Sequence, residues 1–507
     1  MSGPPDTARL AAQVAGGSGL VLLGGIFDRG LRWALKWALA ALVGPGPVGL
    51  VELATRWSST ITAFSPMGLD TGVAYFLGRH RAAGDRGAVK GLVLASMGAS
   101  TGVGALCGVG LAFAGARGWV GGADPALGPI LVAAGPVVAL STPLLTLVGL
   151  LRAAGDARRS TLASQVAQPL ALLLLALPVA ALGGGPVGVL HAMSAAAALA
   201  LALAGRAAWG HFGALFGAQG PRPTLAWGPL LGFSVPQSLT AAAFRLNQYF
   251  DVLILGAYAS AEEVGVYAVA SSIAGFGAVP SNALISMFNP IAAGLIARDE
   301  RAALNRLLQA ATRWLIVVSL PLFLLLLLLP DLLIALYPRG FAGAAPLLLV
   351  LSLGQLIQTA CAPAMRLIPM SGRAGLNLAN GVAALLLNLG LSLWWVPTHG
   401  GAGAAWAGAL TLAAWSLWRL AEVWWLLRCW PFDGRTLIVL GLAGAGGLGL
   451  QLGLPVAALG LRVGGALGLL LALGALVRWQ PRTPEDEAVL GGLVGKLRAR
   501  LGRRGGA

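Results

Sequence analysis

The stretch GGIFDRGLRWALKWALAALVG, residues 24–44, combines the apolar length of a membrane span with four charged side chains. About 20 apolar residues are needed to cross the hydrocarbon core of a bilayer as a helix. Each charge near the bilayer centre costs about 2.5–3.5 kcal/mol on insertion scales, so charges here have to face protein or a water-filled cavity. At about 100° per residue, one quarter of the helix surface carries Asp28, Arg29, Arg32 and Lys36.

A purely structural explanation of these charges is also open. Asp28 and Arg32 are four residues apart and are predicted to form an ion pair on the helix surface. Arg29 or Lys36 can instead reach the lipid headgroups with a long side chain. The ion pair would leave a net charge of about +2 on this face.

The whole chain has the composition of a polytopic membrane protein. Of its 507 residues, 57% are hydrophobic and 10% are charged, and the mean hydropathy is +0.81. Soluble globular chains carry about 25% charged residues. The net charge of +16 is spread over short loops, so we attribute it to membrane topology and expect no nucleic-acid partner.

The sequence shows no sign of enzyme chemistry. It contains no Walker loop, no dinucleotide-binding glycine fingerprint and no plausible Ser/His/Asp set. Its cysteines and histidines are scattered and lack metal-ligand spacing. We therefore expect a protein that is not an enzyme and that uses no cofactor and no metal.

Apolar runs predict fourteen transmembrane helices. Lys and Arg are concentrated in every second loop, and the positive-inside rule then places both termini in the cytoplasm. An even number of helices agrees with this placement. The predicted spans are 14–43, 48–78, 88–115, 126–152, 159–182, 187–209, 225–258, 264–297, 303–329, 343–370, 374–397, 402–430, 434–453 and 455–478.

An internal repeat relates the two halves of the chain at an offset near 216 residues. Residues 44–64, GPGPVGLVELATRWSSTITAF, resemble residues 259–279, ASAEEVGVYAVASSIAGFGAV, with Gly49 matching Gly265. Six helices per repeat is an even number, so both units insert in the same orientation, with a site expected between them. The sequence thus predicts an all-α polytopic membrane protein with two pseudo-symmetric six-helix bundles around a central cavity, plus two C-terminal helices.

This organisation divides the chain into four parts. We predict an N-terminal bundle over 1–222, a C-terminal bundle over 223–433, two additional helices over 434–480 and a basic cytoplasmic tail over 481–507. In the tail, leucines at helical spacing are surrounded by Lys and Arg. This pattern predicts an amphipathic helix over 485–504 that lies on anionic membrane lipid, with a disordered tail as the alternative.

Further polar side chains at membrane depth indicate the chemistry of the cavity. Arg56 lies in the second span, with Glu52 placed near the outer edge, and the seventh span contains Arg245, Asn247 and Asp251. Basic groups outnumber acidic ones, and guanidinium groups bind phosphate bidentately, so the cavity suits an anionic substrate. The predicted substrate-binding residues are Arg29, Arg32, Lys36, Arg56, Arg245 and Asn247, with Asp28 and Asp251 orienting them or coupling protons.

Other expectations concern ion pairs and helix breaks. Instead of binding substrate, Arg245 and Asp251 can form structural ion pairs between helices. Arg419 and Glu422, three residues apart, are expected to form a structural pair. Arg366 lies near the cytoplasmic side, where it can reach the headgroups. Helix breaks are expected at Pro66, Pro236, Pro280, Pro290 and Pro363.

Four segments resemble the multidrug/oligosaccharidyl-lipid/polysaccharide exporter superfamily, and within it the polysaccharide-biosynthesis (oligosaccharide) flippases. They are LVGPGPVGLVELATRW (42–57), SPMGLDTGVAYFLGR (65–79), RLNQYFDVLILGAYASAEEVGVYAVA (245–270) and residues 366–407. The resemblance covers roughly residues 14–430. It implies a flippase of the bacterial cytoplasmic (inner) membrane that moves an undecaprenyl-diphosphate-linked oligosaccharide to the outer leaflet by alternating access. The implied partners are this lipid-linked anionic oligosaccharide and, as a candidate, a polysaccharide polymerase.

Two alternatives within the superfamily remain open. Lipid-II flippases resemble this chain in having fourteen helices and cavity arginines, and Asp28, Arg29, Arg56 and Arg245 sit at comparable places. Cation-coupled multidrug exporters usually have twelve helices and a more acidic cavity. A scaffold within a synthase complex is less expected, because a scaffold has no need of a charged interior.

Overall fold

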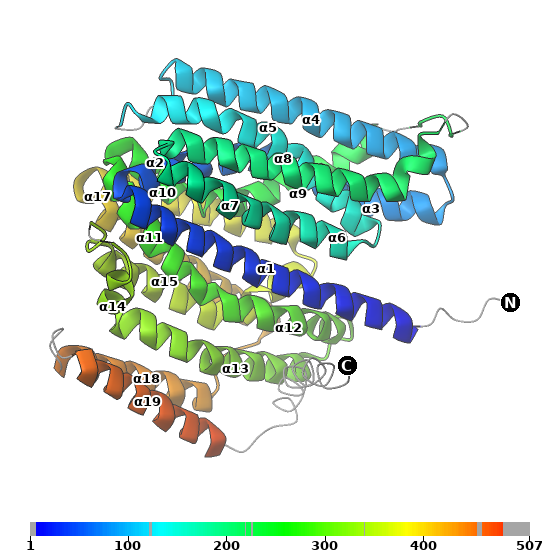
Figure 1. The fold of residues 1–507 in the computed structure, drawn as a ribbon. Helices are drawn as coiled ribbons and strands as arrows, with labels where there is room; N and C mark the ends of the chain where they lie inside the picture. Colours follow the sequence, from blue (N-terminus) through cyan, green and yellow to red (C-terminus); the bar gives the residue numbers. More distant parts are fainter. Residues whose placement is uncertain are drawn as a thin grey trace, which may run out of the picture. The chain divides into compact units, whose positions relative to one another are not determined.

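The chain is an all-α multi-pass membrane protein, as the sequence predicts. Every regular element of the part described by the computed structural model is helical (Figure 1). Eight helices of this part are long and apolar enough to cross a membrane. Each of the fourteen predicted runs contains helix, but the number of crossings stays a prediction. The structure describes residues 7–120, 124–217, 220–224, 227–338, 340–453 and 459–479.

Contacts group the chain into two compact units. The first unit comprises Met1–Ala268 and Val396–Gly401, and the second comprises Val269–Trp395 and Ala402–Ala507. The predicted domain boundaries at residues 222, 433 and 480 follow the repeat and stay a prediction. The amphipathic helix predicted over 485–504 lies outside the described residues.

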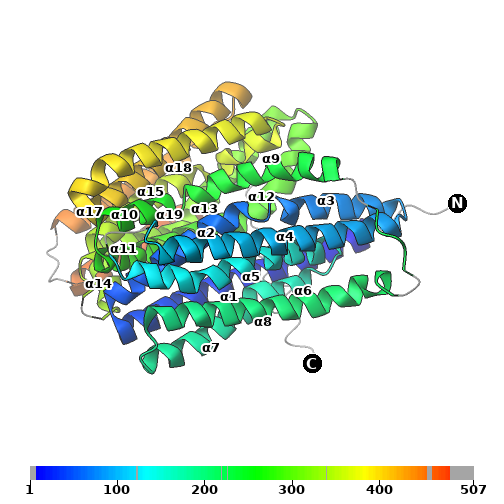
Figure 2. The ribbon, with the colours of Figure 1, turned by 90° about the horizontal axis from the view of Figure 1, so that it is seen from above.

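In the first unit, long helices lie side by side (Figure 1 and Figure 2). Helix α4 packs on α5, α5 on α8, α8 on α7, and α7 on α1. The elements are α1 (Thr7–Val43), α2 (Pro45–Phe64), α3 (Leu69–Ala82), α4 (Arg86–Ala116), α5 (Leu127–Ala153), α6 (Ala157–Thr161), the π-helical η1 (Leu162–Ala167), α7 (Gln168–Ala181), α8 (Gly185–Phe212), η2 (Gly213–Leu215), α9 (Trp227–Leu246), α10 (Phe250–Tyr258) and most of α11 (Ala261–Ala274).

Glycines explain why α4 and α5 approach closely. A Cβ at Gly108 would lie 2.5 Å from the carbonyl oxygen of Gly135, and one at Gly115 would lie 2.9 Å from that of Gly128. Membrane helices associate through such small residues, because lipid supplies no hydrophobic force between apolar side chains. The abundant glycine of this chain therefore serves helix packing here.

In the second unit, apolar side chains of four segments form one core. Phe288, Leu308, Leu367 and Val423 are among its buried members. The elements are the end of α11, η3 (Gly275–Ala278), α12 (Val279–Ala297), α13 (Arg301–Leu328), α14 (Pro330–Ala335), α15 (Ala344–Met365), α16 (Leu367–Met370), α17 (Ala374–Leu427), α18 (Gly434–Gly453) and α19 (Leu459–Trp479).

The last two helices are fastened to α13. Leu320 of α13 shares an apolar cluster with Val439 of α18 and Ala466 of α19. Next to α18, an Asp433 carboxylate oxygen lies 2.5 Å from Nη1 of the buried Arg313. The other oxygen of Asp433 accepts the N–H of Thr436 at 2.8 Å, so one side chain both caps α18 and binds α13.

Two of the five prolines expected to break helices lie where a helix begins or ends. Pro66 lies in the turn between α2 and α3, and Pro280 stands at the start of α12 after η3. Pro236, Pro290 and Pro363 lie inside α9, α12 and α15, so those three predictions are wrong. A membrane helix continues through proline when neighbouring groups satisfy the freed carbonyl.

Gly400 interrupts α17 in the connection that the sequence predicts between the spans 374–397 and 402–430. Its φ of 53° and ψ of −130° are not helical, and the positive φ favours glycine. Glu263 accepts the N–H of Gly401 at 2.6 Å, and a Cβ on residue 400 would collide with this carboxylate. Glycine is therefore required at the bend by both the backbone and its neighbour.

Candidate functional site

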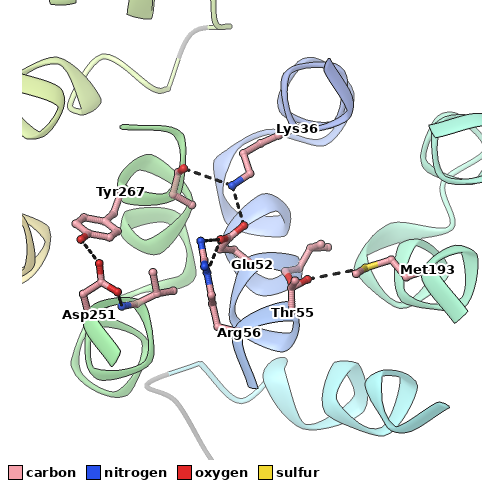
Figure 3. Close-up of polar contacts among 10 residues, drawn as sticks. Lys36, Glu52, Thr55, Arg56, Met193, Asp251 and Tyr267 are labelled. Carbon is pink, nitrogen blue, oxygen red and sulfur yellow. Dashed lines mark hydrogen bonds and ion pairs between the residues drawn. The ribbon is translucent and has the colours of Figure 1, made fainter. Parts of the chain in front are cut away.

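Glu52 on α2 is the centre of an ion-pair network in the first unit (Figure 3). Its Oε2 lies 2.8 Å from Lys36 Nζ on α1, and its Oε1 lies 2.6 Å from an η nitrogen of Arg56. Only 10% of the Glu52 side chain is exposed. The sequence places Glu52 near the outer edge and assigns it no partner. In the structure its carboxylate bridges Lys36 and Arg56.

Both cations of this network also contact a third part of the unit. Lys36 Nζ donates to the carbonyl oxygen of Ala268 on α11 at 3.4 Å. The Arg56 guanidinium lies 5.2 Å from the ring centroid of Tyr249, a cation–π distance. The network therefore joins α1 and α2 to the segments around α10 and α11.

Asp251 at the start of α10 is held by neutral groups. The Tyr267 hydroxyl donates to its Oδ2 at 2.5 Å, and the N–H of Val252 donates to its Oδ1 at 2.8 Å (Figure 3). Within the described residues Asp251 forms no ion pair, so the alternative of a pair with Arg245 is not realised. Asp251 is a membrane-depth carboxyl without a bonded cation.

The ion pair predicted on α1 is confirmed. Arg32 Nε lies 2.7 Å from Asp28 Oδ1. The Arg32 side chain is 47% exposed and that of Asp28 is 22% exposed, so the pair is open to the surroundings.

Arg29 and Arg245 differ from the other predicted cations. Arg29 is exposed on α1, and Arg245 is half-buried in the last turn of α9. In the part of the chain that the structure describes, neither side chain has a hydrogen bond or an ion pair. The difference 245 − 29 = 216 equals the difference 265 − 49 = 216 between the matched glycines, so the two arginines are equivalent in the repeat.

By formal charge, the predicted residues and Glu52 together carry five cations and three anions. Lys36 and Arg56 both pair with Glu52, Arg32 pairs with Asp28, and Asp251, unpaired among the described residues, supplies the third negative charge. The excess positive charge therefore resides on the two repeat-equivalent arginines, Arg29 and Arg245.

The seventh predicted span is discontinuous at membrane depth. Helix α9 ends at Leu246, and Asn247, half-buried and in polar contact, begins a turn that ends at Tyr249. The N–H of Gln248 donates to the carbonyl of Arg245 at 3.0 Å. Discontinuous helices carry substrate sites in many transporters. No proline marks this break, so the amino-acid sequence does not predict it.

Three residues of the network, Glu52, Tyr249 and Tyr267, are not among the predicted site residues. Glu52 was detectable from its spacing of four residues to Arg56. Tyr249 and Tyr267 had no such signal, because their contacts with Arg56 and Asp251 arise from packing between segments.

The structural pair expected between Arg419 and Glu422 is wrong. In the second unit Arg419 donates to the carbonyl of Met365 at 2.6 Å and to Asn377 Oδ1 at 2.9 Å. Glu422 accepts instead from Asn380 at 2.5 Å and from the indole N–H of Trp418 at 2.8 Å. Both charges lie on one helix but bind different neighbours.

The all-helical fold, with long apolar helices and buried ion pairs, is typical of a membrane transporter. The sequence profile of the family described as polysaccharide biosynthesis protein matches residues 14–293, more than half of the chain. The chain belongs to this family, within the multidrug/oligosaccharidyl-lipid/polysaccharide exporter superfamily. No curated protein sequence matches the chain.

Solved structures are similar in fold at low sequence identity. The lipid II flippase MurJ, in an inward closed conformation, has a TM-score of 0.68 and 11% identity, covering 90% of this chain and 98% of that one. An inward-facing multidrug resistance MATE family transporter has a TM-score of 0.66 and 16% identity, covering 79% and 95%. A MOP superfamily transporter from Pyrococcus furiosus has a TM-score of 0.56 and 14% identity, covering 81% and 95%.

Proposed function

We propose that the protein is a flippase for an undecaprenyl-diphosphate-linked oligosaccharide used in cell-surface polysaccharide biosynthesis. It would carry this lipid from the cytoplasmic to the outer leaflet by alternating access. The family match supports the link to polysaccharide biosynthesis. The central cavity predicted from the sequence is part of this proposal.

The observation that carries the proposal is the pair of arginines Arg29 and Arg245. They are repeat-equivalent, and among the described residues no acidic side chain neutralises either. A diphosphate offers two adjacent anionic groups, and guanidinium binds each of them bidentately. Two symmetric cations thus suit two phosphates, whereas a cationic drug would be repelled.

The other predicted residues have secondary roles in this proposal. Arg32 is half-exposed and can approach the substrate while Asp28 orients it. Lys36 and Arg56 contribute when their bonds to Glu52 rearrange. Asn247 would contact a phosphate or a sugar of the substrate, and Asp251 would couple transport to protons.

We also propose a location and partners. The protein lies in the bacterial cytoplasmic membrane with both termini in the cytoplasm, as the alternation of basic loops indicates. The tail over 481–507 would bind anionic lipid, and a polysaccharide polymerase would receive the product.

The test is transport in proteoliposomes. A fluorescent polyprenyl-diphosphate oligosaccharide is loaded, and its exposure is followed with a membrane-impermeant quencher. We expect Arg29→Ala and Arg245→Ala each to slow flipping about 10-fold or more, because each removes a charge-assisted bond to phosphate. Arg117→Ala is the matched control, since Arg117 is an exposed arginine that lies 5.0 Å from the Phe113 ring. Wild-type rates in both cavity variants would contradict the proposal.

The same assay separates the two alternatives. The overall likeness to the lipid II flippase MurJ makes lipid II the first competitor substrate. Faster flipping of lipid II than of other lipid-linked sugars would favour that function. Dye efflux driven by a proton or sodium gradient would favour a multidrug exporter.

A further inference from the structure

Helix α15 is apolar except for one face. Gln355, Gln358, Thr359 and Arg366 fall within about 100° of its surface, at helical spacings of three, four and eleven residues. Polar groups at membrane depth are costly and are tolerated where they face protein or water. We call these four residues the α15 polar face.

The two amides of the α15 polar face bond to each other rather than to another helix. Gln355 Nε2 donates to Gln358 Oε1 at 3.1 Å and to Thr359 Oγ1 at 3.5 Å. Thr359 Oγ1 donates to the carbonyl of Gly277 at 3.2 Å, so only this hydroxyl bonds to a different element. Polar groups that hold membrane helices together bond across helices. The amides of this face are not explained in that way.

This bonding leaves both kinds of hydrogen-bonding group available. Gln358 Nε2 donates to no described residue, and Gln355 Oε1 accepts from none. Both side chains are half-buried, and Arg366 is exposed and also without a polar contact in the described part. The face therefore presents an amide donor and an amide acceptor, and Arg366 follows the last residue of α15.

The repeat shows that the fold itself does not require the two amides. Helix α5 is the counterpart of α15, and their first residues differ by 344 − 127 = 217 positions. Thr359 has the counterpart Thr142, since 359 − 142 = 217, and Thr142 also bonds to another segment, through Ser65 at 2.7 Å. Helix α5 has no amide side chain, so Gln355 and Gln358 are an addition to one half of the repeat.

We propose that the α15 polar face binds the saccharide of the lipid-linked substrate, an inference that rests on the function proposed above. Sugar hydroxyls both donate and accept hydrogen bonds, and a glutamine amide offers both at neutral charge. The two amides would recognise the uncharged hydroxyls of the saccharide.

The experiment compares two probes on the purified full-length protein. One probe is decaprenyl diphosphate, and the other is the same lipid carrying a disaccharide, either of hexose or of N-acetylhexosamine. Dissociation constants are measured for wild type and for the double variant Gln355→Met/Gln358→Met, in which methionine keeps the side-chain length. Asn388→Leu is the matched control, because Asn388 is a buried amide of the same unit that accepts from Ser392 at 3.0 Å.

We expect wild type to bind at least one saccharide-bearing lipid more tightly than the bare lipid. The double variant should lose about 10-fold in affinity for that lipid and keep its affinity for the bare diphosphate, whereas Asn388→Leu should keep the preference. If the double variant fails to fold, the single variant Gln358→Met tests the same prediction, since its Nε2 donates to no described residue.

The outcomes separate the two proposals. An unchanged preference in the glutamine variants, or no preference in wild type, overturns the saccharide site. Failure of wild type to bind either lipid overturns the flippase function itself. An equal loss of affinity for both lipids in the glutamine variants also overturns the saccharide site, because the two glutamines would then have a general structural role.

Discussion

Gly49 and Gly265, which match each other in the internal repeat, pack together in the first unit. A Cβ on Gly49 would collide with the carbonyl oxygen of Ala261, and a Cβ on Gly265 would collide with that of Pro45. The internal repeat makes these glycines equivalent positions, and in the structure they are in contact. Helices α2 and α11 therefore approach each other closely at two equivalent positions of the repeat.

The first prediction concerns this contact. Gly49→Ala should lower the free energy of unfolding by about 1–3 kcal/mol, because its Cβ meets rigid backbone. Thermal unfolding in detergent measures the effect. Gly46→Ala is the control on the same helix, since a Cβ there has nothing within 4 Å. Equal melting temperatures for the two variants would contradict the close packing.

The second prediction concerns the shared carboxylate of Glu52. Glu52→Gln leaves Lys36 and Arg56 without their acidic partner, and breaking a buried ion pair costs about 3–5 kcal/mol. We expect a lower melting temperature together with tighter, salt-sensitive binding of decaprenyl diphosphate, since two cations are released. A folding defect alone would weaken binding, so weaker or unchanged affinity would refute the charge-balancing role. Glu52→Asp should restore part of the stability.

The third prediction concerns Tyr267 and Asp251. Tyr267→Phe removes the hydroxyl that donates to the carboxylate, and Asp251→Asn removes its charge. Hydrogen bonds to charged groups contribute about 1.5–3 kcal/mol, so a double-mutant cycle on unfolding free energies should give a coupling of that order. Additive effects of the two substitutions would show that the bond makes no contribution.

The fourth prediction is a pH dependence at the turn before α6. Burial raises the pKa of the Asp156 carboxyl, but hydrogen bonds from His211 and from the Arg159 N–H, with the Arg159 charge, set it below 3.8. A folded pKa below the unfolded one stabilises the protein above the unfolded pKa, and the contribution is lost as pH falls through the folded value. Asp156→Asn should therefore melt at a lower temperature than wild type at pH 7.

The difference between Asp156→Asn and wild type should shrink as the pH falls below about 3.8. Melting curves over this range check the sign. A difference that is constant with pH would mean that the charge of Asp156 is not the source of the stability.

The sequence predicts the helices well where apolar length alone defines them. Helix α18 has the predicted limits, Gly434–Gly453, and α5, Leu127–Ala153, differs by one residue at each end. Local spacing also predicts the Asp28–Arg32 pair, because four residues make one helical turn. These features depend on near neighbours in the chain.

The errors arise where contacts with residues far away in the chain determine the structure. Arg419 and Glu422 have the spacing of an ion pair. Each instead forms a hydrogen bond with an asparagine in the first half of α17, Arg419 with Asn377 and Glu422 with Asn380. The turn that begins at Asn247 contains neither proline nor glycine, so composition gives no warning of it. The predicted ligand roles of Arg29 and Arg245 stay predictions, although the structure singles these two out by their lack of partners within its described part.

The bond between Arg313 and Asp433 has a consequence for shortened versions of this protein. A chain truncated before Asp433 would keep Arg313 buried and lose the carboxylate that faces it. Asp433 directly precedes α18, so a truncation meant to remove only the last two helices should end after this residue. The choice between these two cut sites decides whether a buried cation keeps its counter-ion.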